Sequence, residues 1–118
     1  MKILIAEDDL ISYIYLQVFL GKFDIIVIHA ENGEQAVEFV KNTPDINLIL
    51  MDIRMPVMDG IEATKLIKKI RPDLPIIAQT ADVFDEGKSR ILSAGCDEYL
   101  VKPLQLEKLN ELVNMYLN

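Results

Sequence analysis

The chain is poor in cysteine and lacks any long hydrophobic run. Its one cysteine, Cys96, cannot form a disulfide within the chain, and such usage is typical of proteins in a reducing cytosol. No stretch approaches the roughly 18 consecutive apolar residues that a membrane-spanning helix needs. A strand pattern begins at Lys2, which leaves no room for a signal peptide. We therefore expect a cytoplasmic domain without membrane contact.

Basic residues are also few, and the sequence shows no repeat, linker or low-complexity segment. The 118 residues include 12 Lys and Arg against 19 Asp and Glu, which gives a net charge of −7. Non-specific nucleic-acid binding depends on clustered basic side chains, so we expect none from this domain. The composition, 51% apolar and 26% charged, is that of an ordinary globular protein. Together with the length, it predicts one domain spanning residues 1–118.

Short apolar runs alternate along the chain with longer amphipathic ones, and glycine, proline and asparagine separate them. Five repeats of strand then helix predict an α/β fold with a five-stranded parallel sheet and helices on both faces. For five strands the expected order is 2-1-3-4-5, the flavodoxin-like order. The expected strands are residues 2–6, 24–29, 48–51, 76–80 and 99–101. The expected helices are residues 10–20, 33–41, 60–70, 83–94 and 106–117.

Polar side chains stand at the ends of these strands. Asp52 follows the apolar run Leu48-Ile49-Leu50-Met51, and three acids, Glu7-Asp8-Asp9, follow the first strand. Strands 1 and 3 are neighbours in the expected order, so these four carboxylates converge at the carboxyl edge of the sheet. Thr80 ends the fourth strand and Lys102 follows the fifth. The sequence therefore predicts one site built from four strand ends.

The residue types at this site point to phosphoryl transfer. Packed carboxylates repel one another, and the repulsion is relieved when one carboxylate holds a proton or when a divalent cation binds. Oxygen ligands suit Mg²⁺, which also neutralises an arriving phosphoryl group. Asp52 is the candidate nucleophile and forms an acyl phosphate, while Lys102 pairs with one phosphoryl oxygen and the Thr80 hydroxyl donates to another.

These motifs resemble those of the receiver domains of two-component response regulators, and the resemblance covers the whole chain. The matching segments are Glu7-Asp8-Asp9, residues 52–60, Thr80-Ala81 and residues 99–103, in the family's order and at its intervals. The resemblance implies a phosphorylation-switched module of a phosphorelay, without small-molecule turnover apart from its own phosphorylation and dephosphorylation. Asp52 would accept its phosphoryl group from a histidine on a histidine kinase or histidine phosphotransfer protein. Segments 78–81 and 94–99 look most like receivers attached to hybrid histidine kinases.

The resemblance also implies a ligand set for the cation. Asp9, Asp52 and the backbone carbonyl of Arg54 would ligate Mg²⁺, with Asp8 acting through water. Glu7 occupies a position where acids vary, and we expect it to have a supporting role at most.

Further roles follow from the same resemblance. Tyr99 matches an aromatic switch whose ring turns inward when Thr80 moves toward the phosphate. This switch would reshape the face formed by the fourth helix, fifth strand and fifth helix, where a downstream effector would bind. Lys102-Pro103 matches a position where a cis peptide is usual. Arg54 and Asp82 occupy variable positions that tune dephosphorylation, and their opposite charges predict an ion pair across the site mouth.

Three other functions compete with this interpretation. An aspartate-nucleophile phosphohydrolase of the haloacid dehalogenase class would place a second acid two residues after its nucleophile, where this chain has Arg54. A flavin-binding electron carrier would need a phosphate loop after the first strand, where Glu7-Asp8-Asp9 would repel phosphate. A degenerate receiver that only binds partners would lack part of the phosphorylation site, whereas every required residue is present. The phosphorylated receiver is the favoured prediction.

The helix expected at residues 10–20 is apolar on two sides. Its sheet-facing side holds Ser12, Tyr13, Leu16, Phe19 and Leu20. The opposite side, normally polar on a surface helix, holds Ile11, Ile14, Tyr15 and Val18. One explanation is cover by a neighbouring domain or a dimer partner. The other is a docking patch for the phosphodonor, since an exposed apolar patch usually marks an interaction site.

Overall fold

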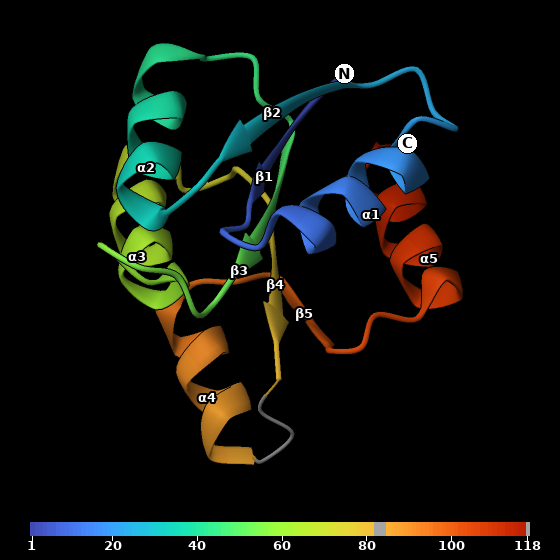
Figure 1. The fold of residues 1–118 in the computed structure, drawn as a ribbon. Helices are drawn as coiled ribbons and strands as arrows, with labels where there is room; N and C mark the ends of the chain where they lie inside the picture. The colour runs from blue at the N-terminus through green and yellow to red at the C-terminus, as the bar shows by residue number, and fades with distance from the viewer. Residues whose placement is uncertain (82–84, 118) are drawn as a thin grey trace.

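The computed structural model describes residues 1–81 and 85–117, which form five strands and five helices (Figure 1). The sheet is parallel throughout, in the order β2-β1-β3-β4-β5, which confirms the expected flavodoxin-like arrangement. The strands are β1 (Lys2–Ala6), β2 (Ile26–Ala30), β3 (Leu48–Asp52), β4 (Ile76–Thr80) and β5 (Glu98–Val101). The helices are α1 (Leu10–Leu20), α2 (Gly33–Asn42), α3 (Gly60–Ile70), α4 (Asp85–Ala94) and α5 (Leu106–Leu117).

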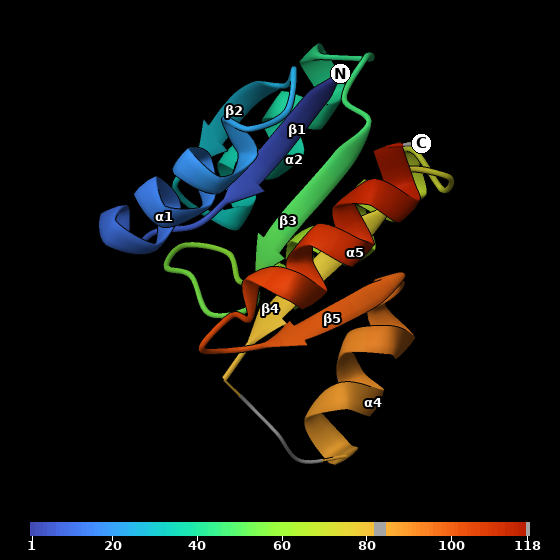
Figure 2. The same ribbon diagram turned by 90° about the vertical axis from the view of Figure 1, so that its right-hand side faces the viewer.

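Helices cover both faces of the sheet. Figures 1 and 2 show α1 and α5 on one face and α2, α3 and α4 on the other. Successive strand residues alternate between the faces. In β1, for example, Leu4 packs into the core under α2 and α3, whereas Ile3 and Ile5 pack under α1 and α5. Both faces of the central strands are therefore buried, which explains their unbroken apolar sequences.

Strand boundaries differ slightly from the expected ones because pairing decides them. β2 begins at Ile26 instead of residue 24, since Ile26 is the partner of Lys2, where β1 begins. The same register pairs Ala30 with Ala6 and extends β2 by one residue. β3 includes Asp52, which lies opposite Gln79 of β4. The phosphoacceptor candidate is thus the last residue of a central strand.

The helices match their expected ranges closely, with α2 ending one residue later, at Asn42. The expected start of the fourth helix at residue 83 lies outside the described residues, as does Asp82. Within the described part, no helix is long and apolar enough to cross a membrane. The peptide bond between Lys102 and Pro103 is cis, as expected from the sequence.

Candidate functional site

Asp52 is held rigidly at the carboxyl end of β3. Its side chain is almost fully buried, with the residue 5% exposed. The amide of Ile53 donates to the Gln79 carbonyl at 3.1 Å, and the amide of Gly60 donates back to the Ile53 carbonyl at 2.8 Å. A Cβ at Gly60 would collide with the Asp52 carbonyl, so only glycine permits this approach. The loop that follows Asp52 is therefore folded back against the strand end.

Glu7, Asp8 and Asp52 converge at this edge. The resemblance had implied Asp8, Asp9 and Asp52 around the cation. Carboxylate oxygens of Glu7, Asp8 and Asp52 lie within 4.8 Å of one another. Glu7 is fully buried, whereas Asp8 is exposed. This grouping gives Glu7 a central place that sequence reasoning did not assign to it.

Asp9 lies beside this cluster but points its carboxylate elsewhere. It is the N-cap of α1, accepting from the Ile11 amide at 3.4 Å and from the Ser12 hydroxyl at 2.8 Å. The Ser12 hydrogen bond lowers the pKa of Asp9 below its ordinary value. Aspartate directly before a helix is a strong capping signal, and this signal in the sequence could have predicted the capping role of Asp9.

Lys102 joins the acids from the β5 side. Its Nζ lies 3.3 Å from Asp52 Oδ1 and 3.4 Å from Glu7 Oε1. Burial lowers the pKa of Lys102, but the charges of Asp52 and Glu7 outweigh this effect and raise it overall. Burial, followed by the hydrogen bond and charge of Asp52, raises the pKa of Glu7 from 4.5 to about 7. The site therefore holds more negative charge than one ammonium group balances.

The remaining predicted residues border a pocket of about 210 Å³ over Asp52. Thr80, 5% exposed at the end of β4, lines it together with Ala81. Arg54 also lines the pocket, and its amide donates to Asp52 Oδ1 at 3.4 Å. Asp82, the ion-pair partner that the sequence predicts for Arg54, lies outside the described residues.

The candidate switch residue Tyr99 lies on β5, half-buried against the core beneath α4. The Lys88 ammonium of α4 sits 5.5 Å from the centre of its ring, within the range of a cation–π contact. Tyr99 thus links β5 to α4, two parts of the expected effector face.

The outer side of α1 is apolar and exposed, as its helical pattern indicated. The inner residues Leu16, Phe19 and Leu20 are buried, whereas the outer ones reach exposed fractions as high as 79% at Ile11. The four residues of this outer patch are Ile11, Ile14, Tyr15 and Val18.

The donor set of the acidic cluster fits a hard divalent cation. Three carboxylates supply only oxygen ligands, one of them exposed, which suits an ion that retains several water ligands. A divalent charge would also offset the excess negative charge around Glu7 and Asp52.

Comparison with known proteins places this geometry in a family. The family model described as response regulator receiver domain matches residues 3–114. The chain is 43% identical over 121 residues, 98% of its length, to hybrid signal transduction histidine kinase G of Dictyostelium discoideum. It spans 4%, 5% and 7% of the length of that kinase and of kinases M and I from the same organism.

Similar solved structures include two receiver domains. One is the receiver domain of the Pseudomonas aeruginosa sensor histidine kinase PA1611, with a magnesium ion coordinated in its active site cleft. It has a TM-score of 0.89 and 31% identity, covering 98% of this chain and 95% of that one. The other is the complex of the yeast phosphotransfer protein Ypd1 with the receiver domain of Ssk1 from Saccharomyces cerevisiae. It has a TM-score of 0.91 and 33% identity, covering 98% and 88%. Because the family model matches nearly the whole chain, this protein belongs to the response regulator receiver domains, the signalling modules of two-component phosphorelays.

Proposed function

We propose that Asp52 is the phosphoacceptor of this receiver domain, and that residues 1–118 form one such domain. The observation that carries the proposal is the contact of a buried Asp52 with Lys102 at 3.3 Å, inside a cluster of three carboxylates. An Asp52 oxygen attacks the phosphorus of a partner phosphohistidine, the P–N bond breaks, and its electron pair returns to the imidazole ring. Lys102 and Thr80 then bind oxygens of the transferred group.

Glu7, Asp8 and Asp52, together with the Arg54 carbonyl expected from the sequence, are the proposed holders of Mg²⁺. The magnesium ion in the cleft of the PA1611 receiver domain supports this assignment. When bound, the ion neutralises negative charge on the phosphoryl oxygens and on the clustered acids. The exposed carboxylate of Asp8 is proposed as a direct ligand of the ion. Glu7 lies deeper, and its carboxylate also contacts the ammonium of Lys102. Asp9 is left out because its carboxylate is engaged by α1.

The proposed output is a conformational switch. Thr80 moves toward phosphorylated Asp52, and Tyr99 turns into the space vacated. The face formed by α4, β5 and α5 then changes shape for a downstream effector. The position of Tyr99 under Lys88 supports this route, because inward rotation would break the contact between β5 and α4.

The proposed phosphodonor is a histidine kinase or a histidine phosphotransfer protein that docks on the outer patch of α1. The patch begins two residues after Asp9, next to the phosphoacceptor site, and the Ypd1 complex shows that a structurally similar receiver domain binds such a protein. Similarity to hybrid kinases supports an origin in a hybrid histidine kinase with a cytoplasmic receiver.

Phosphorylation by a small donor tests the central assignment. The protein is incubated with acetyl phosphate and Mg²⁺, and its intact mass is measured. We expect the wild type and the matched control Asp73→Asn to gain one phosphoryl group, and Asp52→Asn to gain none. Excess chelator should prevent the gain. Full labelling of Asp52→Asn would contradict the assignment of the phosphoacceptor.

A further inference from the structure

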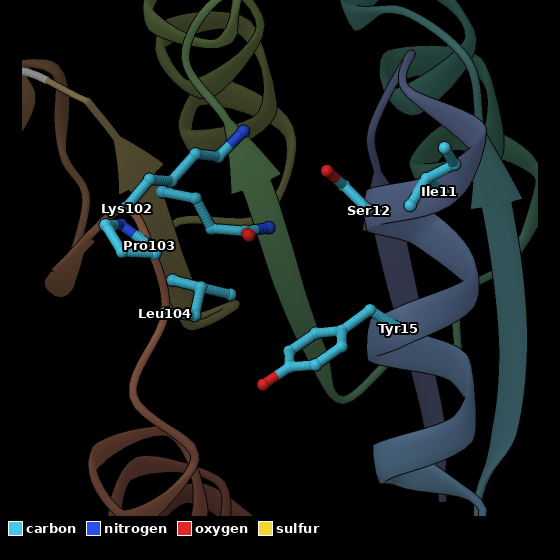
Figure 3. A pocket seen from close by; sticks show the side chains of 7 residues that line it. Ile11, Ser12, Tyr15, Lys102, Pro103 and Leu104 are labelled. Carbon is cyan, nitrogen blue, oxygen red and sulfur yellow. The ribbon is translucent and has the colours of Figure 1, made fainter.

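A second pocket lies on the other side of Lys102, between α1 and the chain that follows β5 (Figure 3). Its volume is about 360 Å³, which falls within the range of small-molecule sites. Figure 3 shows Ser12 and Tyr15 reaching from α1 toward Pro103 and Leu104 on the opposite wall. Apart from Lys102, these walls offer mainly carbon atoms and the hydroxyls of Ser12 and Tyr15.

A buried amide lines the same pocket without a partner. Gln79, next to last in β4, is 1% exposed. Among the described residues, its Nε2 has no hydrogen-bond partner. Buried side-chain donors are nearly always paired, because an unpaired one loses its hydration without compensation. The unpaired N–H of Gln79 therefore indicates a missing hydrogen-bond acceptor, one that the described residues do not provide.

Two other polar groups of the pocket are already engaged. The Ser12 hydroxyl donates to Asp9 at 2.8 Å, and the Lys102 ammonium lies against Asp52 and Glu7. The positive charge of Lys102 is thus already paired with acids, and the chain carries a net charge of −7. An anionic occupant would be repelled by the neighbouring acids. This arrangement favours an uncharged occupant.

We propose that this pocket binds an uncharged small molecule with an aryl or branched alkyl body and one carbonyl oxygen. The carbonyl oxygen accepts from Gln79 Nε2, and the apolar body packs against Tyr15 and Leu104. A small molecule fits better than a protein segment, because the donor is almost fully covered and only a compact group that enters the pocket reaches it. This site lies outside the proposed phosphotransfer chemistry, although its occupant touches the side chain of Lys102 and the pocket shares Ile11 and Tyr15 with the outer patch of α1.

Paired probes with and without a carbonyl test the proposal. Acetophenone and ethylbenzene are titrated separately into the protein, and NMR follows the Gln79 side-chain amide and the Leu104 methyl groups. We expect both signals to shift saturably, with acetophenone binding about fivefold more tightly, the effect of one neutral hydrogen bond. In Gln79→Leu the two probes should bind within about twofold of each other, whereas the matched control Gln17→Leu should keep the preference.

Stability gives an independent measurement. Removing an unpaired buried amide should raise the urea midpoint of Gln79→Leu above that of the wild type. Gln79→Met serves the same purpose if the leucine variant does not fold. Equal affinities for the two probes in the wild type, or shifts that do not saturate, would overturn the proposal. Tighter binding of benzoate than of acetophenone would overturn the assignment of an uncharged ligand.

Discussion

At the scale of single residues, three consecutive acids have three different surroundings. β1 ends at Ala6 and α1 begins at Leu10, so each acid leaves the connecting segment in a different direction. Glu7 turns into the sheet edge, Asp8 faces the pocket and Asp9 caps the helix. The sequence prediction treated the three acids as one motif and assigned Asp9 to the cation, because it did not consider Asp9 as a helix cap.

This difference yields a prediction with a matched pair of variants. Asp8→Ala should weaken Mg²⁺ binding by at least about tenfold, because it removes a ligand oxygen. Asp9→Ala should bind Mg²⁺ almost as the wild type does but unfold at lower urea concentration, because α1 loses its cap. Calorimetric Mg²⁺ titration and urea unfolding measure the two effects. The reverse pattern would restore the ligand set expected from the sequence.

Glu7 should make stability depend on pH in the absence of metal. Its pKa is raised from 4.5 to about 7 in the folded state, so the folded protein binds a proton that the unfolded chain releases between these values. The free energy of unfolding should therefore fall as pH rises through this window, by at most about 3 kcal/mol.

Unfolding in urea with a chelator, at pH 5 and at pH 7.5, measures this fall. Glu7→Gln carries a neutral side chain at both values and should show a smaller decrease than the wild type. The matched control Glu111→Gln, on the exposed side of α5, should behave as the wild type. An equal decrease in wild type and Glu7→Gln would mean that Glu7 is ionised throughout.

At the scale of elements, α1 shows how much local pattern determines. The expected helix and the observed one both span residues 10–20, with Asp9 as the N-cap and Gly21 as the C-cap. Its inner and outer sides also follow from the spacing of residues 10–20, because helical geometry fixes which positions share a face. The start of β2 did not follow from its own sequence, because pairing with Lys2 of β1 decides it.

The outer patch of α1 should determine transfer from a protein donor. Ile14→Glu or Val18→Glu should slow phosphorylation by a phosphorylated histidine protein by about tenfold, because a charge replaces apolar contact. Labelling by acetyl phosphate needs no docking and should stay unchanged. Met115→Glu, a similar change on exposed α5, is the control.

Radiolabelled transfer and intact mass measure the two routes of labelling in these variants. Equal loss with both donors would indicate misfolding. No loss with either would place docking elsewhere.

At the scale of the whole molecule, the topology brings distant segments together. The predicted order places β1, β3, β4 and β5 side by side, so residues from positions 7, 52, 80 and 102 meet at one edge. This strand order could be predicted from the sequence, because the rules for connecting parallel strands allow few topologies. The unpaired Gln79 amide did not follow, because the packing of α1 against the segment after β5 creates its pocket.

The same topology connects Asp52 to Tyr99 through β4, the strand that lies between β3 and β5. Phosphorylation can shift the equilibrium of Tyr99 only through contacts that differ between its two states, and the Thr80 hydroxyl is the proposed contact. Thr80→Ala should therefore still accept a phosphoryl group from acetyl phosphate. The accompanying shift in the NMR signals of the Tyr99 ring should fall by about half or more. The control Thr43→Ala, at the end of α2, should retain the full shift. A full shift in Thr80→Ala, with mass measurement confirming its phosphorylation, would show that the two sites communicate by another route.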